Sequence, residues 1–445
     1  MAKQLFGTDG IRGVAGQFPL DPASTHAFGM ALGSVVRRLG PDPMVVIGMD
    51  TRESGPWIAA QVAGGLEEVG VGVQFAGVVT TPGVAFLTRT NAFVAGVMIS
   101  ASHNPYQDNG IKVFGHSGYK LPDEEEHAIE EEIFRLLAAG VEPMPARLTV
   151  DEGLDRRYLD NLLSTIPTPL PRFRLAIDCG NGAASRLAPE LFCRAGAEVI
   201  AIGCEPDGRN INLGCGALHP GYVRNSVLEQ GADAGVAFDG DADRSIFVSK
   251  SGRIVDGDAV LLIAARALRD RGRLPGNLAV ATVMSNLGLE RALERLGIRM
   301  TRTAVGDKYV LEEMLRSGAA LGGEQSGHIL FSAHSTTGDG MLTALQVLAI
   351  MAESGKGLDE LAADLTTFPQ RLVNVRVREK KTLSDLPSVV REVQDCEAEL
   401  GSSGRVLVRF SGTEPLARVM VEAADQRQVD EFTARIAGAI EREIG

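Results

Sequence analysis

Short apolar runs alternate with longer stretches of helical periodicity through most of this 445-residue chain. Residues 95–99, 234–238 and 319–323 are runs of apolar or small side chains, and polar side chains follow each run at once. Runs of this kind are typical of strands buried inside a sheet. Because predicted helices separate them from the other apolar runs, the pattern predicts an α/β fold with mainly parallel sheets.

The alternation forms a unit that occurs three times. In each unit a strand leads through a helix to a second strand, and through further helical sequence to a third. Glycine commonly follows the last turn of a helix, as Gly70, Gly196 and Gly297 do here. Such a repeat indicates duplicated domains. The predicted strands are residues 44–48, 71–76 and 95–99, then 174–178, 198–202 and 234–238, then 278–283, 298–303 and 319–323. The first helices of the units are residues 54–69, 184–195 and 286–296.

The C-terminal part has a different pattern, which indicates a small α+β domain. Its predicted strands are residues 372–378, 405–410 and 417–423, and its predicted helices are residues 384–400 and 426–443. We therefore expect three duplicated, mixed or parallel α/β domains followed by an α+β domain. The expected domain ranges are 1–150, 151–255, 256–369 and 370–445.

Composition and charge narrow the possible partners. The formal net charge is −13 and there is no long basic run, which argues against a nucleic-acid partner. The five cysteines include no CxxC pair, as expected for reduced thiols of a cytoplasmic protein. The N-terminus has no apolar signal core, and the apolar helical stretch 341–352 is too short to span a bilayer, so we expect no membrane role.

The first repeat ends in a loop with a candidate nucleophile. Ser102 and His103 follow the apolar run 95–99, and open α/β sheets place their chemistry at the carboxyl ends of strands. A serine there can act as a nucleophile if a neighbour activates it. The alternative is an ordinary polar turn after a strand.

The second repeat ends in a candidate metal site. Asp239, Asp241 and Asp243 alternate with small residues, so their carboxylates point the same way in an extended loop. Oxygen ligands of this kind favour Mg²⁺ or Ca²⁺. An EF-hand is excluded, because its sixth and twelfth positions would be Arg244 and Lys250 rather than Gly and Glu. The alternative is a solvated acidic turn.

A phosphorylated Ser102 would supply a further oxygen ligand to such an ion and would be a phosphoryl donor. Phosphoryl transfer also needs positive charge near the transferred group. Arg244 and Lys112 are candidates for that charge, although each alone is more often a surface cation. The opening sequence FGTDGIRG, residues 6–13, is predicted to be a glycine-rich loop that approaches an anion and carries Arg12. The alternative there is a flexible N-terminal turn.

Two further loops have side chains suited to a phosphosugar. The loop of the third repeat offers an acceptor, a hydroxyl and an imidazole for sugar hydroxyls, although its histidine could equally be packed in a core. The C-terminal hairpin offers an arginine fork, hydroxyls and a glycine for a phosphate, or is only a polar turn. These residues are Glu324, Ser326 and His328 in the first case, and Arg409, Ser411, Gly412, Thr413 and Arg418 in the second.

Together these loops resemble the α-D-phosphohexomutase superfamily over the whole chain. They read SASHNP at 100–105, DGDADR at 239–244, GEQSGH at 323–328 and RFSGTEP at 409–415, in the order that the superfamily has. The opening FGTDGIRG, the segment AVGDKY at 304–309 and Gln325 are most similar to the bacterial phosphoglucosamine mutase branch. The phosphomannomutase/phosphoglucomutase branch more often has Met in place of Gln325.

The resemblance implies four domains around a central cleft and the interconversion of glucosamine 6-phosphate and glucosamine 1-phosphate. It implies a phosphoserine enzyme and a glucosamine 1,6-bisphosphate intermediate, in a step toward UDP-N-acetylglucosamine and cell-wall precursors. A homodimer is also consistent with it. By the resemblance, Ser102 would carry the phosphate and hold one Mg²⁺ together with Asp239, Asp241 and Asp243. His103, Arg12, Lys112 and Arg244 would lie near the transfer, Glu324, Ser326 and His328 would bind the sugar, and Arg409, Ser411, Gly412, Thr413 and Arg418 would bind the other phosphate.

Three alternatives stay open at this point. The first is a phosphomutase for mannose or glucose phosphates, and the second is a sugar phosphatase that uses the same phosphoserine. The third is a protein that binds phosphosugars without catalysis, against which the intact Ser102 and three aspartates argue.

Overall fold

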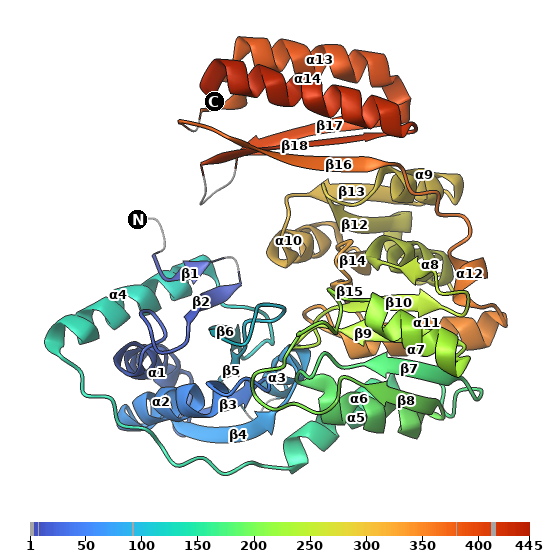
Figure 1. The fold of residues 1–445 in the computed structure, drawn as a ribbon. Helices are drawn as coiled ribbons and strands as arrows, with labels where there is room; N and C mark the ends of the chain where they lie inside the picture. The colour runs from blue at the N-terminus through green and yellow to red at the C-terminus, as the bar shows by residue number, and fades with distance from the viewer. Residues whose placement is uncertain (1–3, 8, 91–92, 380, 411–414) are drawn as a thin grey trace. The chain divides into compact units, whose positions relative to one another are not determined.

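The computed structural model describes residues 4–7, 9–90, 93–379, 381–410 and 415–445. It divides into two compact units, one of residues 1–284 with 300–363 and the other of residues 285–299 with 364–445. The described residues form three mixed α/β sheets in the first unit and one antiparallel sheet in the second (Figure 1). The expected fold class is therefore confirmed.

The first sheet has six strands in the order β1-β2-β6-β5-β3-β4. Strands β4, β3 and β5 are parallel, and β6 is antiparallel to β5. The elements are β1 (Phe6–Gly7), β2 (Gly10–Val14), α1 (Pro22–Val36), η1 (Arg37–Leu39), β3 (Met44–Met49), α2 (Gly55–Glu68), β4 (Gly72–Val78), α3 (Thr81–Thr88), β5 (Ala95–Ile99), β6 (Asp108–Gly115) and α4 (Asp123–Ala139).

The second sheet has the order β11-β10-β9-β7-β8, and the third has the order β13-β12-β14-β15. The elements around the second sheet are α5 (Gly153–Ser164), β7 (Arg174–Asp178), α6 (Ala184–Ala195), β8 (Glu198–Ile202), α7 (Gly221–Gln230), β9 (Ala234–Phe238), β10 (Ser245–Ser249) and β11 (Ile254–Val255). Those around the third are α8 (Gly257–Asp270), η2 (Pro275–Asn277), β12 (Leu278–Thr282), β13 (Arg299–Thr303), α10 (Asp307–Ser317), β14 (Leu321–Gly323), β15 (Ile329–Phe331), α11 (Gly340–Ser354) and α12 (Leu358–Leu361).

The three sheets share one connectivity, as the repeat predicts. The orders β4-β3-β5-β6, β8-β7-β9-β10 and β13-β12-β14-β15 match strand by strand. In each case the third strand in sequence, β5, β9 or β14, pairs antiparallel with the strand that follows it. The polar loops after these three strands therefore occupy equivalent places in their sheets.

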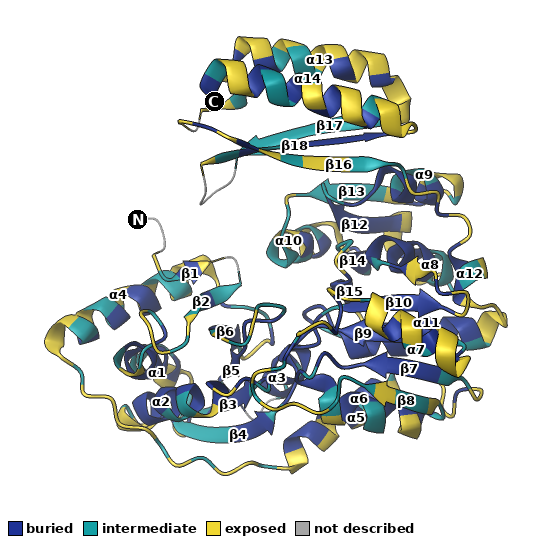
Figure 2. Cartoon of the chain, viewed as in Figure 1, coloured by how far each residue is buried: buried dark blue, intermediate teal, exposed yellow. Residues whose placement is uncertain are grey.

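Burial of the strands explains their uniform apolar sequences. Every residue of β5 and β9 is buried, and these strands are dark blue in Figure 2. The core under the first sheet includes Val97 and Ile99 with Phe28 and Leu32 of α1. Since both faces of these strands are covered, alternation of polar and apolar side chains is absent from them.

The second unit is a three-stranded antiparallel sheet in the order β16-β18-β17, with its own apolar core. Its elements are α9 (Leu287–Arg295), β16 (Gln370–Arg376), η3 (Leu383–Asp385), α13 (Pro387–Leu400), η4 (Gly401–Ser403), β17 (Gly404–Phe410), β18 (Leu416–Ala423) and α14 (Gln426–Ile444). The prediction of one helix over residues 384–400 was wrong at its start. Leu386 is non-helical (φ −120°, ψ 75°), because the ring of Pro387 disfavours a helical residue before it, and α13 begins at Pro387.

The prediction for the opening sequence also needs a correction. Residues 6–13 are predicted to form a glycine-rich loop, but β1 and β2 pair there as antiparallel strands that extend the first sheet. The reason is a close approach that requires glycine. Gly10 has φ +84°, and a Cβ at this position would lie 2.3 Å from the carbonyl oxygen of Ile111 on the neighbouring strand. Among the helices in the described ranges, none is both long and apolar enough to cross a membrane.

Candidate active site

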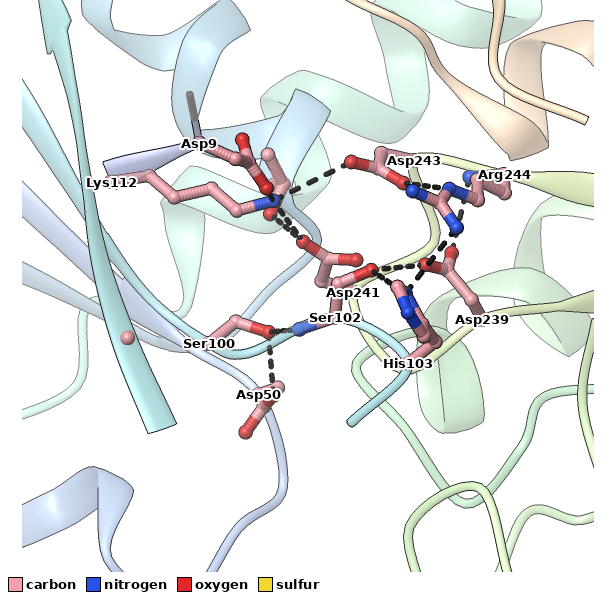
Figure 3. Close-up of polar contacts among 12 residues, drawn as sticks. Asp9, Asp50, Ser100, Ser102, His103, Lys112, Asp239, Asp241, Asp243 and Arg244 are labelled. Atoms are coloured by element: carbon pink, nitrogen blue, oxygen red, sulfur yellow. Dashed lines mark hydrogen bonds and ion pairs between the residues drawn. The ribbon is translucent and has the colours of Figure 1, made fainter. Parts of the chain in front are cut away.

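Loops from the three repeats meet in the first unit. β5 leads to Ser102, β9 leads to Asp239 and β14 leads to Glu324, while Arg244 and His328 form an isolated backbone bridge between the second and third loops. The Ser102 hydroxyl donates a hydrogen bond to Asp239 Oδ2 at 2.5 Å (Figure 3). The loops that the sequence repeat marked as equivalent therefore converge on one place.

The serine loop is held in an unusual conformation by buried polar side chains. Ser102 has φ +53°, in the left-handed region that non-glycine residues rarely adopt. Its N–H donates to Ser100 Oγ at 2.9 Å, and Ser100 Oγ donates to Asp50 Oδ2 at 2.6 Å. Both contacts are visible in Figure 3, and they fix the start of the loop to the end of β3.

Arg52 completes this support, and the sequence reasoning missed it. Its side chain is fully buried and donates to the carbonyl oxygens of Ser102 at 2.9 Å, Asn104 at 2.8 Å and Asp108 at 3.0 Å. Its Nε donates to Asp50 Oδ2 at 2.9 Å, and its Nη1 also donates to the carbonyl of Pro105. The sequence could have indicated this contact. Arg52 follows β3, and β3 is the parallel neighbour of β5, so the residues after both strands lie at the same edge of the sheet.

The aspartate loop can hold a metal ion. Asp239, Asp241 and Asp243 are buried, and one carboxylate oxygen of each lies within 4.8 Å of the others. Asp241 Oδ1 and Asp243 Oδ1 are buried and accept no hydrogen bond from any described residue. Buried carboxylate oxygens without donors are costly unless a cation satisfies them. The donor set therefore fits a hard divalent cation such as Mg²⁺.

A glycine lets this loop approach the serine loop closely. A Cβ on Gly240 would lie 2.4 Å from the carbonyl oxygen of Ser102, which no side chain tolerates. Ala242, two residues on, has φ +56°. The close backbone contact between Gly240 and Ser102 is what brings the hydroxyl within reach of Asp239.

Asp239 and Asp243 of this loop have opposite pKa shifts. Burial and the nearby charges of Asp243 and Asp241 raise the pKa of Asp239 well above its usual range. Burial would also raise the pKa of Asp243, but Lys112, His328 and Arg244 outweigh it and hold that pKa well below its usual range. An additional cation between the carboxylates would lower the pKa of Asp239, so the loop as folded favours binding of positive charge.

Lys112 supplies fixed positive charge beside this loop. Its Nζ lies 2.9 Å from Asp241 Oδ2, 3.0 Å from Asp9 Oδ2 and 3.5 Å from Asp243 Oδ2 (Figure 3). Burial would lower the pKa of Lys112, but these carboxylates outweigh it and raise that pKa well above its usual value. The side chain lies on β6 and is only 2% exposed, so it is not a surface cation.

Two arginines and His103 complete the polar surround of Ser102. His103 Nδ1 lies 3.5 Å from the Ser102 hydroxyl and accepts from Arg244 Nη1 at 3.3 Å, while Arg12 Nη2 donates to Asp9 at 2.5 Å. Burial and the charges of Arg244 and Arg12 lower the pKa of His103. The Nε atoms of Arg12 and Arg244 are buried and donate no hydrogen bond to a described residue, although Arg244 Nε lies 3.8 Å from Asp243 Oδ1. Buried guanidinium N–H groups that donate no hydrogen bond suit an anion such as a phosphoryl group.

These groups line a cavity of about 400 Å³ together with residues of the third repeat. Glu324 faces it, and Glu324 Oε1 accepts from the Gly306 N–H at 3.1 Å. Ser326 of the same loop is exposed and is not part of the cavity lining. Gln325 donates to Asp256 Oδ2 at 3.2 Å, which attaches the loop to the start of α8.

His328 is both packed and part of the cavity, so the two alternatives for it are not exclusive. It is buried, its Nε2 accepts from the Gly338 N–H at 3.1 Å, and its Nδ1 lies 3.6 Å from Asp243 Oδ1. Burial would lower the pKa of His328, but Asp243, Asp307 and Glu324 outweigh it and raise the pKa to about 9. In the structure the Gly338 contact needs a lone pair on Nε2, so it belongs to the neutral ring with its proton on Nδ1, on the side of Asp243.

The candidate phosphate loop belongs to the second unit. Arg409 on β17 and Arg418 on β18 are directly opposite each other in the antiparallel ladder. Like charges in this arrangement repel, and burial together with Arg418 lowers the pKa of Arg409. An anion bound beside the pair would relieve the repulsion. Ser411, Gly412 and Thr413 lie outside the described residues.

Comparisons with known proteins agree with this arrangement. Models of the phosphoglucomutase/phosphomannomutase family match its α/β/α domain I at residues 3–139, domain II at 156–252, domain III at 256–368 and the C-terminal domain at 372–439.

A protein of Solibacter usitatus named phosphoglucosamine mutase is 64% identical over 445 residues, covering 100% of both chains. One of Koribacter versatilis with the same name is 53% identical over 100% of this chain and 98% of its own. The crystal structure of a phosphoglucomutase/phosphomannomutase family protein from Burkholderia thailandensis superposes with a TM-score of 0.80, at 25% identity, over 98% of this chain and 97% of that one.

Proposed function

The chain belongs to the phosphoglucomutase/phosphomannomutase family, and we propose that it acts as a phosphoglucosamine mutase, which interconverts glucosamine 6-phosphate and glucosamine 1-phosphate. The full-length relatives at 64% and 53% identity bear that name. The observation that carries the proposal is the Ser102 hydroxyl at 2.5 Å from Asp239, in a carboxylate cluster where Asp241 Oδ1 and Asp243 Oδ1 accept no hydrogen bond from the described residues. The reaction would serve the synthesis of UDP-N-acetylglucosamine and cell-wall precursors.

In this proposal Ser102 carries a phosphoryl group in the active enzyme. Asp239, Asp241 and Asp243, with an oxygen of that group, would hold one Mg²⁺. When bound, the ion would neutralise charge on the phosphoryl group during transfer. Ser102 is about 1% exposed, which supports the further inference that the protein keeps bulk water from the phosphoserine.

The transfer itself breaks one bond and forms another. A hydroxyl oxygen of the phosphosugar attacks phosphorus and the bond from phosphorus to Ser102 Oγ breaks. The proton that the hydroxyl loses is matched by one that Ser102 Oγ gains, and glucosamine 1,6-bisphosphate forms. The bisphosphate then reorients, and Ser102 Oγ takes back the other phosphoryl group, which leaves the isomer. Lys112, Arg12 and Arg244 surround the transferred group with positive charge, and their N–H groups are already oriented before the substrate arrives.

The remaining roles concern the sugar and its second phosphate. Glu324, Ser326 and His328 would bind the sugar hydroxyls, and His103 would lie near the transfer. Arg409 and Arg418, with Ser411, Gly412 and Thr413, would hold the phosphate that is not reacting. The opposed arginines of β17 and β18 support this assignment, because their repulsion decreases when an anion binds.

The proposal is tested with purified protein, Mg²⁺ and catalytic glucosamine 1,6-bisphosphate. We expect isomerisation of glucosamine phosphate, a Ser102→Ala variant without it, and an intact mass that includes one phosphoryl group on the wild-type chain. A preference for mannose or glucose phosphates of more than about tenfold in kcat/KM, about 1.4 kcal/mol, would favour the other branch of the family. Release of inorganic phosphate without an isomer would favour a phosphatase, and binding without turnover a non-catalytic protein.

A further inference from the structure

Lys120 occupies a bridging position that neither the sequence reasoning nor the proposed mechanism uses. It follows the turn after β6, and its backbone forms an isolated bridge with Phe114. Its Nζ lies 2.6 Å from Asp9 Oδ1 and 2.6 Å from Asp307 Oδ2. Its side chain is about 20% exposed, so the two ion pairs are mostly shielded from water.

The two contacts belong to a row of alternating charges. Asp241 contacts Lys112 at 2.9 Å, Lys112 contacts Asp9 at 3.0 Å, and Asp9 contacts Lys120 and through it Asp307. The row begins at the candidate metal ligands and ends at the first residue of α10, in the third repeat. The row of charges therefore connects the aspartate loop, which lies beside Ser102, with the start of α10 in the third repeat.

The far end of the row adjoins the sugar loop. Asp307 follows Gly306, whose N–H donates to Glu324 Oε1 at 3.1 Å. Asp307 Oδ2 also lies 3.9 Å from His328 Nε2. Asp307 is thus linked to the Glu324 carboxylate through the backbone of Gly306.

A second contact joins the same two parts of the chain. The carbonyl oxygen of Gly118, in the turn before Lys120, accepts from Thr336 Oγ1 at 2.7 Å. The turn is itself rigid, since the Gly115 N–H donates to the Tyr119 carbonyl at 2.8 Å. The turn of residues 115–120 therefore links the first sheet to the loop after β15 of the third sheet, and Lys120 makes the ionic contact of this turn.

We propose that Lys120 is a positioning residue, which sets the sugar loop relative to Ser102 by holding Asp9 and Asp307 together. The proposal rests on the proposed function, since it concerns transfer between Ser102 and the sugar. Without the ammonium group, two carboxylates that now share one Nζ would face each other and repel. Burial would raise the pKa of Asp9, but Lys112, Lys120 and Arg12 outweigh it, so Asp9 stays ionised and needs these partners.

Positioning predicts a selective loss. Lys120 contacts neither Ser102 nor the metal ligands, so hydrolysis of the phosphoenzyme without sugar should be unchanged. The rate of phosphoryl transfer to the sugar should fall, because a displacement of the reacting groups by about 1 Å can lower a rate by about 10²-fold. A merely destabilising substitution would instead affect both reactions together.

The test compares Lys120→Met with Lys120→Arg, and uses Lys308→Met as a matched control. Lys308 is next to Asp307 in sequence and pairs with Asp123 at 2.6 Å, but the side chains of this pair are 32% and 60% exposed. We expect Lys120→Met to lower kcat/KM for glucosamine 1-phosphate by about 10- to 100-fold. Lys120→Arg should recover most of it, and Lys308→Met should stay within about twofold of wild type.

Single-turnover measurements separate the possible outcomes. Phosphoenzyme of Lys120→Met should lose its phosphate to water at the wild-type rate while transferring it slowly to the sugar. Wild-type transfer in this variant, or equal losses in hydrolysis and transfer, would overturn the positioning role and leave the proposed function intact. A wild-type chain that isomerises no phosphosugar would overturn both. If Lys120→Met does not fold, Lys120→Gln removes the same charge with a polar side chain and must give the same selective loss.

Discussion

Arg52 offers the sharpest test of how the serine loop is built. Its guanidinium has five N–H groups, and five acceptors surround it: the carbonyls of Ser102, Asn104, Pro105 and Asp108, and a carboxylate oxygen of Asp50. In Arg52→Lys the charge stays, but an ammonium group has only three N–H donors at one point. At least two of the five bonds are therefore lost.

The magnitude follows from those lost bonds. A hydrogen bond that involves a charged group contributes about 1.5–3 kcal/mol, so the loop conformation should lose about 3 kcal/mol or more. The left-handed conformation of Ser102 (φ +53°) is itself unfavourable and persists only while its surroundings enforce it. A loss of about 3 kcal/mol in the population of the active loop corresponds to about 10²-fold in rate.

The assay is kcat/KM for glucosamine 1-phosphate, together with thermal unfolding. Arg52→Lys should lose about 10²-fold in kcat/KM, and Arg52→Met should also lose about 3–5 kcal/mol of stability, because it leaves buried Asp50 unpaired. Arg209→Lys is a suitable control, since Arg209 pairs with Glu53 at the surface with 66% of its side chain exposed. An Arg52→Lys variant with wild-type kcat/KM would refute the reasoning.

Three further predictions concern the metal, the second phosphate and pH. Asp241→Asn should lower activity and weaken its dependence on Mg²⁺ together, and a metal titration that matches wild type would contradict the site. Arg409→Ala should mainly raise KM if the residue holds the phosphate that does not react, as proposed; a loss confined to kcat would place it at the transition state instead. Burial raises the pKa of Asp178 to about 6, above its value in the unfolded chain, so the folded chain binds the proton more tightly. The contribution of Asp178 to the free energy of unfolding is fully present below about pH 4, and about 3 kcal/mol is lost as the pH rises through 6. Denaturant titrations at pH 4 and pH 7 measure this loss. Asp178→Asn should lack this loss, and an equal change in both proteins would contradict the shifted pKa.

The repeat and the three loops could be predicted from the sequence, because buried strands produce short apolar runs. Such runs can be recognised without knowing which residues they contact. The likeness of residues 95–99 and 234–238 marked the loops of Ser102 and Asp239 as equivalent, and their side chains are in contact. The domain boundaries and the roles of the site residues stay predictions.

What sequence reasoning missed depends on contacts between distant residues. Arg52 and Lys120 look like ordinary surface cations in sequence, yet Arg52 contacts Ser102 across 50 positions and Lys120 contacts Asp307 across 187. The opening sequence was misjudged for the same reason, since the close approach of Gly10 to Ile111 is a tertiary contact. The glycine content of residues 6–13 suggests a loop, and only the pairing of β2 with β6 shows that these residues are part of the sheet.

The most direct test of the central claim follows a single labelled phosphoryl group. The wild-type chain is phosphorylated with labelled bisphosphate, freed of excess reagent and mixed with glucosamine 6-phosphate and Mg²⁺. The account predicts that the label maps to Ser102 before mixing and appears in glucosamine 1,6-bisphosphate within one turnover. Label on another residue, or label that passes only to water while the isomer still forms, would contradict it.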